Sequence, residues 1–280
     1  MKLKLAHSPD ADDAFMFYAL AEGLIDSGRY EFEHILQDIQ TLNERALRGE
    51  LDVTAVSIHA YAYLADRYAL LSSGASMGDN YGPIVIGRRR FGREELKGVK
   101  IAVPGELTSA FLALQLYLGG RGGDAFDYAV VPFDEIFAYV RDGRAEAGLI
   151  IHEGQLTYGG EGFELSVDLG KWWHDETGGL PLPLGGNAIR RDLGAEVIRD
   201  VSRILRESIR YGLEHRADGL AHARALGRGL EGEALGRFVG MYVNELTLDY
   251  GDRGRRAVQE FLSRGAKAGL VPAPRHLEFV

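Results

Sequence analysis

Residues 2–20, KLKLAHSPDADDAFMFYAL, decide the fold class, because they indicate a strand, a tight loop and a helix in immediate succession. Lys2–His7 alternates apolar and polar side chains, which is typical of a half-buried strand. Ser8-Pro9-Asp10 interrupts the alternation, and Ala14–Leu20 supplies apolar residues that suit a helix. A strand that leads into a helix in this way predicts an α/β protein.

The same succession of strand and helix recurs as far as Ile151. Further strands are predicted at Tyr30–Gln37, Asp52–Val56, Lys100–Val103, Tyr128–Phe133 and Ala147–Ile151. Helices are predicted to begin near Thr41, where Glu44 completes a capping-box pattern, near Ser57 and near Thr108-Ser109. Strands alternating with helices predict parallel sheets, and two successive sets of them predict two similar lobes.

The lobe boundaries follow from breaks in this pattern and from chain length. Two lobes are expected in 280 residues, which is near the upper limit for one hydrophobic core. The prolines and paired glycines of Leu180–Gly186 suit a crossing between lobes. The mostly helical tail, Ala195–Val280, should return to the first lobe. We therefore predict one lobe from residues 1–88 and 186–280, and a second from residues 89–185.

Composition excludes several classes of protein. The net charge of −9, from 32 basic and 41 acidic residues, argues against a nucleic-acid surface. The absence of cysteine excludes disulfides, thiolate nucleophiles, iron–sulfur clusters and Cys-ligated zinc. No histidine spacing suits a metal, and no phosphate-binding glycine motif is present. With no secretory leader and no membrane-length apolar run, we expect a cytoplasmic protein with no cofactor and no membrane partner. The sequence predicts no oligomeric state.

Hydroxyl side chains stand where predicted strands give way to helices. Ser57, Thr108 and Ser109 occupy such positions, and ligands of α/β sheets bind beyond the carboxyl ends of the strands. Helix N-termini there favour anions, so these residues could hold a carboxylate. They could equally be ordinary N-caps. Asn43, in the first turn of the helix that Thr41 is predicted to cap, either faces solvent or points into the cleft.

His152 is the candidate for acid–base chemistry. It follows the apolar run Ala147–Ile151, so a strand should bring it to the ligand-binding edge. An imidazole there can take or give a proton near neutral pH. A purely structural role is the alternative for a single histidine at a strand end.

Several segments together resemble the 1,4-dihydroxy-6-naphthoate synthase family of the futalosine route to menaquinone. The likeness covers nearly the whole chain. It is carried by Ser8–Leu20, Asp38–Leu47, Gly82–Val85, Ala102–Gly105, Ala145–Glu153, Asp168–Gly170 with Trp172-Trp173, Thr177–Gly185 and Tyr242–Asn244.

The resemblance implies a two-lobed fold like that of periplasmic binding proteins (type II), with a cleft between the lobes. It implies a lyase without cofactor that converts cyclic dehypoxanthinyl futalosine, a small aromatic carboxylate, into 1,4-dihydroxy-6-naphthoate. His152 would be the catalytic base, and the ligand contacts would be Asn43, Ser57, Thr108, Ser109 and Ala110. The alternatives are a chorismate dehydratase of the same superfamily and a non-enzymatic solute-binding protein.

Overall fold

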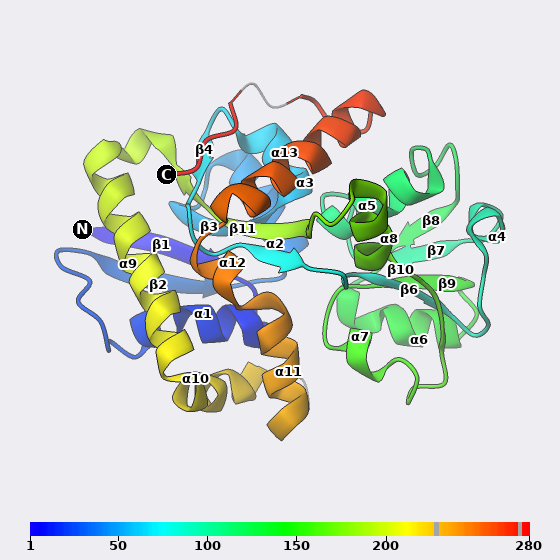
Figure 1. Ribbon diagram of the computed structural model, residues 1–280, viewed down its shortest axis with the longest axis horizontal. Coiled ribbons are helices and arrows are strands. Elements are labelled where there is room, and N and C mark those ends of the chain that lie inside the picture. Colours follow the sequence, from blue (N-terminus) through cyan, green and yellow to red (C-terminus); the bar gives the residue numbers. More distant parts are fainter. Residues whose placement is uncertain (227–229, 274–275) are drawn as a thin grey trace.

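The chain forms two sheets, each at the centre of one lobe (Figure 1). This computed structural model describes residues 1–226, 230–273 and 276–280. The first sheet has the strand order β2-β1-β3-β11-β4, with β5 paired to β11. Its strands are β1 (Lys2–His7), β2 (Glu31–Leu36), β3 (Val53–Ser57), β4 (Tyr68–Leu70), β5 (Ser76–Gly78) and β11 (Leu182–Arg190).

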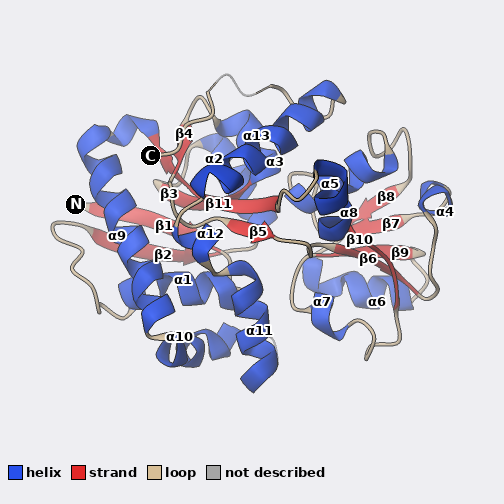
Figure 2. Cartoon of the chain, viewed as in Figure 1, coloured by secondary structure: helices blue, strands red, loops and turns tan. Residues whose placement is uncertain are grey.

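The second sheet has the order β10-β6-β9-β7-β8. Its strands are β6 (Ile84–Gly87), β7 (Ile101–Val103), β8 (Tyr128–Val130), β9 (Ala147–Ile150) and β10 (Glu164–Asp168). Helices cover the faces of both sheets (Figure 2). They are α1 (Ala11–Ala21), α2 (Ile39–Arg48), α3 (Ile58–Leu64), α4 (Arg93–Lys97), α5 (Ser109–Leu118), α6 (Ile136–Arg141), α7 (Gly154–Thr157), α8 (Leu169–Thr177), α9 (Ala195–Glu214), α10 (Arg216–Ala223), α11 (Gly232–Tyr242), α12 (Glu245–Leu248) and α13 (Gly251–Lys267). None of these helices is long and apolar enough to cross a membrane.

The prediction of wholly parallel sheets is wrong at two strands. β1, β2 and β3 pair in parallel, as do β7, β8 and β9, but β11 runs antiparallel to β3, β4 and β5. β6 likewise runs antiparallel to β9 and β10. The physical reason is the double crossing of the chain, because β6 and β11 enter their sheets from the other lobe rather than through a helical crossover.

The crossings also lie earlier than the predicted boundaries. The chain leaves the first sheet between Gly78 and Ile84, so β6 belongs to the second lobe although it precedes residue 88. It returns before Leu182, because the Pro and Gly residues predicted as a crossing are part of the long strand β11. The Pro and Gly residues of this mostly buried antiparallel strand were interpreted as a crossing between lobes.

The capping prediction for α2 is also wrong by one turn. α2 begins at Ile39, and Asp38 is its N-cap, accepting the N–H of Thr41 at 3.0 Å. The Thr41 hydroxyl donates to the same carboxylate at 2.5 Å. A carboxylate reaches the exposed N–H groups of a first turn as well as a hydroxyl does, so Asp38 takes the position assigned to Thr41. The predicted end at Gly49 is confirmed, with φ +73°.

The lobes share one apolar cluster on the side of α3, α5, α8 and α13. It includes Val56 and Phe261 from the first lobe and Leu112 and Trp173 from the second, all fully buried. Trp173 packs edge-on against Phe261, with ring centroids 5.3 Å apart. Figure 1 shows α13 and α5 on this same side. Burial of such side chains stabilises by roughly 1.5–3 kcal/mol each, so this cluster holds the lobes together on this side.

Candidate active site

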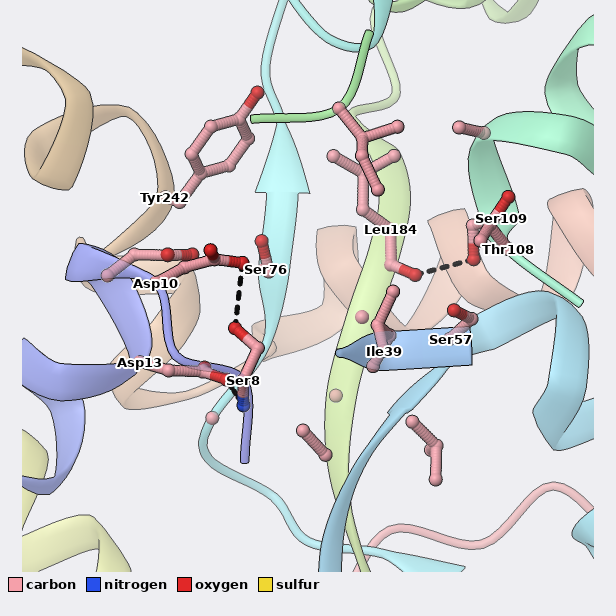
Figure 3. Close-up of a pocket in the computed structure, with 18 of the residues that line it drawn as sticks. Ser8, Asp10, Asp13, Ile39, Ser57, Ser76, Thr108, Ser109, Leu184 and Tyr242 are labelled. Carbon is pink, nitrogen blue, oxygen red and sulfur yellow. Dashed lines mark hydrogen bonds between the residues drawn. The ribbon is translucent and has the colours of Figure 1, made fainter. Parts of the chain in front are cut away.

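A pocket of about 790 Å³, partly open to solvent, lies between the lobes (Figure 3). The first lobe contributes residues from the start of α1, the end of β3, the middle of β11, and α11. The second lobe contributes the residues that open α5, and Ile151 after β9. Because β1, β3, β7 and β9 all end here, the pocket has the location expected for ligands of α/β sheets.

The hydroxyl wall of the pocket brings together four of the predicted contact residues: Ser57, Thr108, Ser109 and Ala110. Ser57 is the N-cap residue of α3, yet its side chain makes no capping bond. Its Oγ instead accepts the Nδ2–H of Asn43 at 2.9 Å. The Ser57 hydroxyl hydrogen is thereby left available for an acceptor inside the pocket.

Asn43 lies behind this wall rather than in it. Its side chain is fully buried, and its Oδ1 accepts the backbone N–H of Ser57 at 2.8 Å. The two bonds fix the amide in one orientation and hold the end of β3 against α2. Asn43 therefore positions Ser57, a role that its place in the sequence did not distinguish from a direct ligand contact.

Thr108 and Ser109 differ in their partners although they are adjacent. The Thr108 hydroxyl accepts the N–H of Phe111 and donates to the carbonyl of Gly105 at 2.9 Å, so it is the N-cap of α5. The Ser109 hydroxyl accepts the N–H of His59 at 3.1 Å and donates to the carbonyl of Leu184 at 2.5 Å. Ser109 thus joins the second lobe to α3 and to β11 of the first.

Sequence reasoning assigned no role to His59, which makes a further contact between the lobes beside Ser109. Its Nδ1 lies 3.1 Å from the carbonyl oxygen of Thr108. Burial lowers the pKa of His59 to about 4, so the ring is neutral at pH 7 and Nδ1–H donates to that carbonyl. A neutral histidine adds no charge to the hydroxyl wall, which must rely on hydroxyl and backbone donors for an anion.

Three aspartates form the opposite, acidic wall: Asp10, Asp12 and Asp13, at the start of α1 (Figure 3). Asp13 accepts the N–H of Ser8 at 2.6 Å, and the Ser8 hydroxyl donates to Asp10 at 2.8 Å. These residues belong to a segment that carries the family resemblance, but none of them was predicted as a contact residue. Three aspartates within four positions directly after a strand and loop were the signal that could have found them.

The acidic wall is less charged than its composition indicates. Burial raises the pKa of Asp13 to about 7, although the Ser8 N–H bond opposes the shift. Burial also raises the pKa of Asp12 well above its ordinary value, and the charges of Asp13, Asp10 and Glu153 raise it further. A carboxyl group that keeps its proton near neutral pH can donate a hydrogen bond to a ligand.

Tyr242 closes the pocket from α11, and sequence reasoning missed it as a site residue. Its hydroxyl donates to Oε1 of Gln155, in α7 of the second lobe, at 2.7 Å. Burial raises the pKa of Tyr242 well above its ordinary value, so the phenol stays protonated. Because Tyr242 and α1 are more than two hundred residues apart in the chain, no local pattern could bring them together.

His152 lies at the end of β9, as predicted, but Ile151 rather than His152 lines the pocket. Its Nδ1 accepts the N–H of Gly154 at 3.0 Å, so Nε2 carries the proton and donates to the carbonyl of Phe133 at 3.1 Å. The ring also packs edge-on against Phe133, with centroids 5.6 Å apart. In this conformation the imidazole is held by backbone partners of the second lobe.

Within residues 1–226, 230–273 and 276–280, no group of three or more His, Asp or Glu side chains is placed to hold a metal ion.

Comparison with solved structures defines the class of protein. A Candida albicans protein described as having the generic periplasmic binding protein fold superposes with a TM-score of 0.70, covering 97% of this chain and 91% of that one. Its identity is 15%, so the likeness concerns the fold alone. The two-lobed α/β architecture with a cleft is therefore of the periplasmic-binding-protein type, as the sequence predicted.

The chain belongs to the menaquinone biosynthesis family, whose model matches residues 3–267. Two curated relatives, both named 1,4-dihydroxy-6-naphthoate synthase, match nearly the full length. The Thermus thermophilus protein is 42% identical and covers 98% of both chains, and the Streptomyces coelicolor protein is 36% identical over 97% of this chain and 95% of that one. A solved Archaeoglobus fulgidus protein is 44% identical, with a TM-score of 0.91 over 96% of this chain and 98% of that one. The predictions of this family and of an enzyme are confirmed.

Proposed function

We propose that this chain converts cyclic dehypoxanthinyl futalosine into 1,4-dihydroxy-6-naphthoate, with His152 as the general base. The observation that carries the proposal is the 42% identity, over 98% of both chains, to a relative named for that product. The pocket agrees with it, because its hydroxyl wall suits a carboxylate. The reaction would take place in the cytoplasm and without a cofactor.

The two walls suggest how the substrate lies. Its carboxylate would accept hydrogen bonds from Ser57 and from the N–H groups that open α5 at Ser109 and Ala110. Its uncharged, hydroxyl-bearing ring would then face Asp12 and Asp13, whose raised pKa values let them donate hydrogen bonds. This orientation keeps the carboxylate away from the acidic wall and places the ring at the end of the pocket nearer α11.

His152 would take a proton from that ring with Nδ1, the nitrogen that carries the lone pair. Because His152 does not line the pocket in this conformation, its ring must first turn toward the pocket, and Nδ1 must give up the Gly154 N–H, a bond worth about 0.5–1.5 kcal/mol. The Phe133 carbonyl, by accepting from Nε2–H, would stabilise the charge that forms on the imidazole. Proton removal would start a retro-aldol cleavage of a carbon–carbon bond, and aromatisation of the second ring would drive it.

Incubation with cyclic dehypoxanthinyl futalosine, followed by the absorbance of the naphthoate, tests the proposal. Wild-type protein should form the product, and His152→Asn should bind 2-naphthoate normally while turnover falls about a hundredfold or more. His174→Asn is the matched control, because His174 lies on α8 outside the pocket lining. Near-wild-type turnover in His152→Asn would exclude His152 as the base, and consumption of chorismate instead would favour the dehydratase.

A further inference from the structure

The two lobes meet at a second seam, on the side away from their shared apolar cluster. Here Tyr242 of α11 donates its hydroxyl to Oε1 of Gln155 in α7 at 2.7 Å. Tyr242 is 3% exposed and Gln155 is 8% exposed, so water competes little for this bond. Nε2 of Gln155 has no hydrogen-bond partner in the described part of the chain. An amide buried with half of its groups unpaired costs free energy, which indicates a role other than stability.

Apolar contacts place the rest of α7 against the first lobe. Leu156, next to Gln155, packs on the first-lobe cluster that contains Phe238 and Tyr242. α7 belongs to the second lobe by chain position, since it follows β9 directly. The Tyr242–Gln155 bond is therefore part of a contact that exists only while the lobes are together.

The same tyrosine touches the crossing segment between the lobes. Tyr81, between β5 and β6, donates its hydroxyl to the carbonyl of Met241, and its ring packs edge-on against that of Tyr242 at 5.8 Å. A rotation of the second lobe about this crossing segment would move α7 relative to Tyr242. The end of α11 thus contacts both the segment that would bend and the helix that would move.

The Tyr242–Gln155 contact lies close to His152 along the chain, and two hydrogen bonds connect them. The N–H of Gln155 donates to the carbonyl of His152 at 2.9 Å, and the N–H of Gly154 donates to its Nδ1 at 3.0 Å. Residues 152–155 therefore form one hydrogen-bonded turn, and a shift of Gln155 displaces the backbone that holds the imidazole.

We propose that Tyr242 and Gln155 form a closure latch: their hydrogen bond forms when the lobes close over substrate and fixes the position of the turn that carries His152. Both are positioning residues, and this role rests on the proposed function of His152. The latch would couple lobe closure to the position of His152, because Tyr242 of the first lobe binds Gln155, which lies in the same turn of the second lobe as His152.

Tyr242→Phe and Gln155→Leu test the latch, because each removes one partner and keeps most of the packing volume. Each should lower kcat about two- to tenfold, the size of one buried hydrogen bond. The double variant should lose no more than the more affected single variant, since both changes remove the same bond. Tyr68→Phe is the control, because it removes a buried phenol bond of equal length, to Leu51, within the first lobe. It should leave kcat unchanged.

Lobe closure can be measured independently of turnover. The chain has no cysteine, so Asp66→Cys and Asp142→Cys would place single spin labels on exposed sites in the two lobes. With saturating 2-naphthoate, the closed population should fall in Tyr242→Phe but not in Tyr68→Phe. Unchanged kcat and closure in both latch variants, or losses that multiply in the double variant, would overturn the latch. If wild-type protein forms no naphthoate, the proposed function fails, and the label distances still decide the latch.

Discussion

The fold strongly raises the pKa of Asp13. Its carboxyl is buried at the start of α1, and burial raises its pKa to about 7 from an ordinary value near 3.8. The native state therefore holds a proton that the unfolded chain releases between those two values. By linkage, this contribution to stability is complete below pH 4 and is lost as the pH rises through 7.

Asp13→Asn should remove this dependence, because an amide resembles the protonated acid and can still accept the Ser8 N–H. The free energy of unfolding of the variant minus that of wild type should grow between pH 4 and pH 7, by on the order of a few kcal/mol. Urea titrations at several pH values measure this difference. The lowered pKa of His7, about 3, acts in the opposite direction but is common to both proteins and cancels. A constant difference across that range would contradict a raised pKa at Asp13.

Predictions from sequence at the residue scale succeeded where local order decides position. Ser57 ends β3, and Ser109 and Ala110 open the helix that follows β7, so the order of strands and helices along the chain sufficed to place them at the sheet edge. The orientation of the His152 ring depends on the carbonyl of Phe133 and the N–H of Gly154, and no residue pattern in the sequence predicts these two contacts. The resemblance supplied its proposed role, and the structure supplied its hydrogen-bond partners.

At the scale of elements, the first turn of α8 is fitted against the segment that links the lobes. Asp168 caps α8 by accepting the N–H of Gly170 at 2.9 Å. A methyl group on Gly170 would overlap the backbone of Tyr81 and Gly82. Backbone cannot move aside as a flexible side chain can, so only glycine allows this close approach.

Gly170→Ala should therefore lower the free energy of unfolding by about 3 kcal/mol, at the upper end of the usual cost of overpacking. Gly159→Ala is the matched control, because an added methyl group there meets no atom within 4 Å and the site is exposed. It should change stability by less than about 1 kcal/mol. Equal denaturation midpoints for the two variants would show that α8 can move away from the linking segment.

The elements that sequence reasoning missed are short strands whose conformation depends on pairing with neighbouring strands rather than on the propensities of their own residues. The tail was predicted to be mostly helical, and α9 to α13 confirm this, because its longer helices have their own apolar periodicity. β4, β5 and β6 are three or four residues long, and their strand character comes from β11 and β9 beside them. The direction of β11 likewise depends on its neighbours, so a run of Pro and Gly indicated a crossing instead of a strand.

For the molecule as a whole, the position of the pocket determines which motions matter. The shared cluster around Trp173 and Phe261 fixes one side, while the Tyr242–Gln155 seam and the pocket lie where the lobes can separate. A carboxylate held by Ser57 from one lobe and by the start of α5 from the other would stabilise the closed form. Ligand binding and closure are then coupled in free energy.

The carboxylate itself should therefore drive closure. 2-Naphthoate should raise the melting temperature and reduce the radius of gyration of wild-type protein, whereas 2-naphthol, with the same rings, should do neither. Ser57→Ala should weaken 2-naphthoate binding about ten- to a hundredfold, as expected for a hydrogen bond to a charged group. Its stability without ligand should also fall, by about 1–3 kcal/mol, because Asn43 keeps its bond to the Ser57 backbone but loses the acceptor of its buried Nδ2–H.

Thr108→Ala should lose stability without losing affinity, since the Thr108 hydroxyl is already used as the N-cap of α5. We expect a loss of about 1 kcal/mol in stability with nearly unchanged affinity for 2-naphthoate. Calorimetric titrations and thermal melts of the two variants separate a ligand contact from a helix cap. If Ser57→Ala binds 2-naphthoate as wild type does, or if 2-naphthol compacts the protein equally, the carboxylate does not bridge the lobes and closure must follow from the aromatic rings alone.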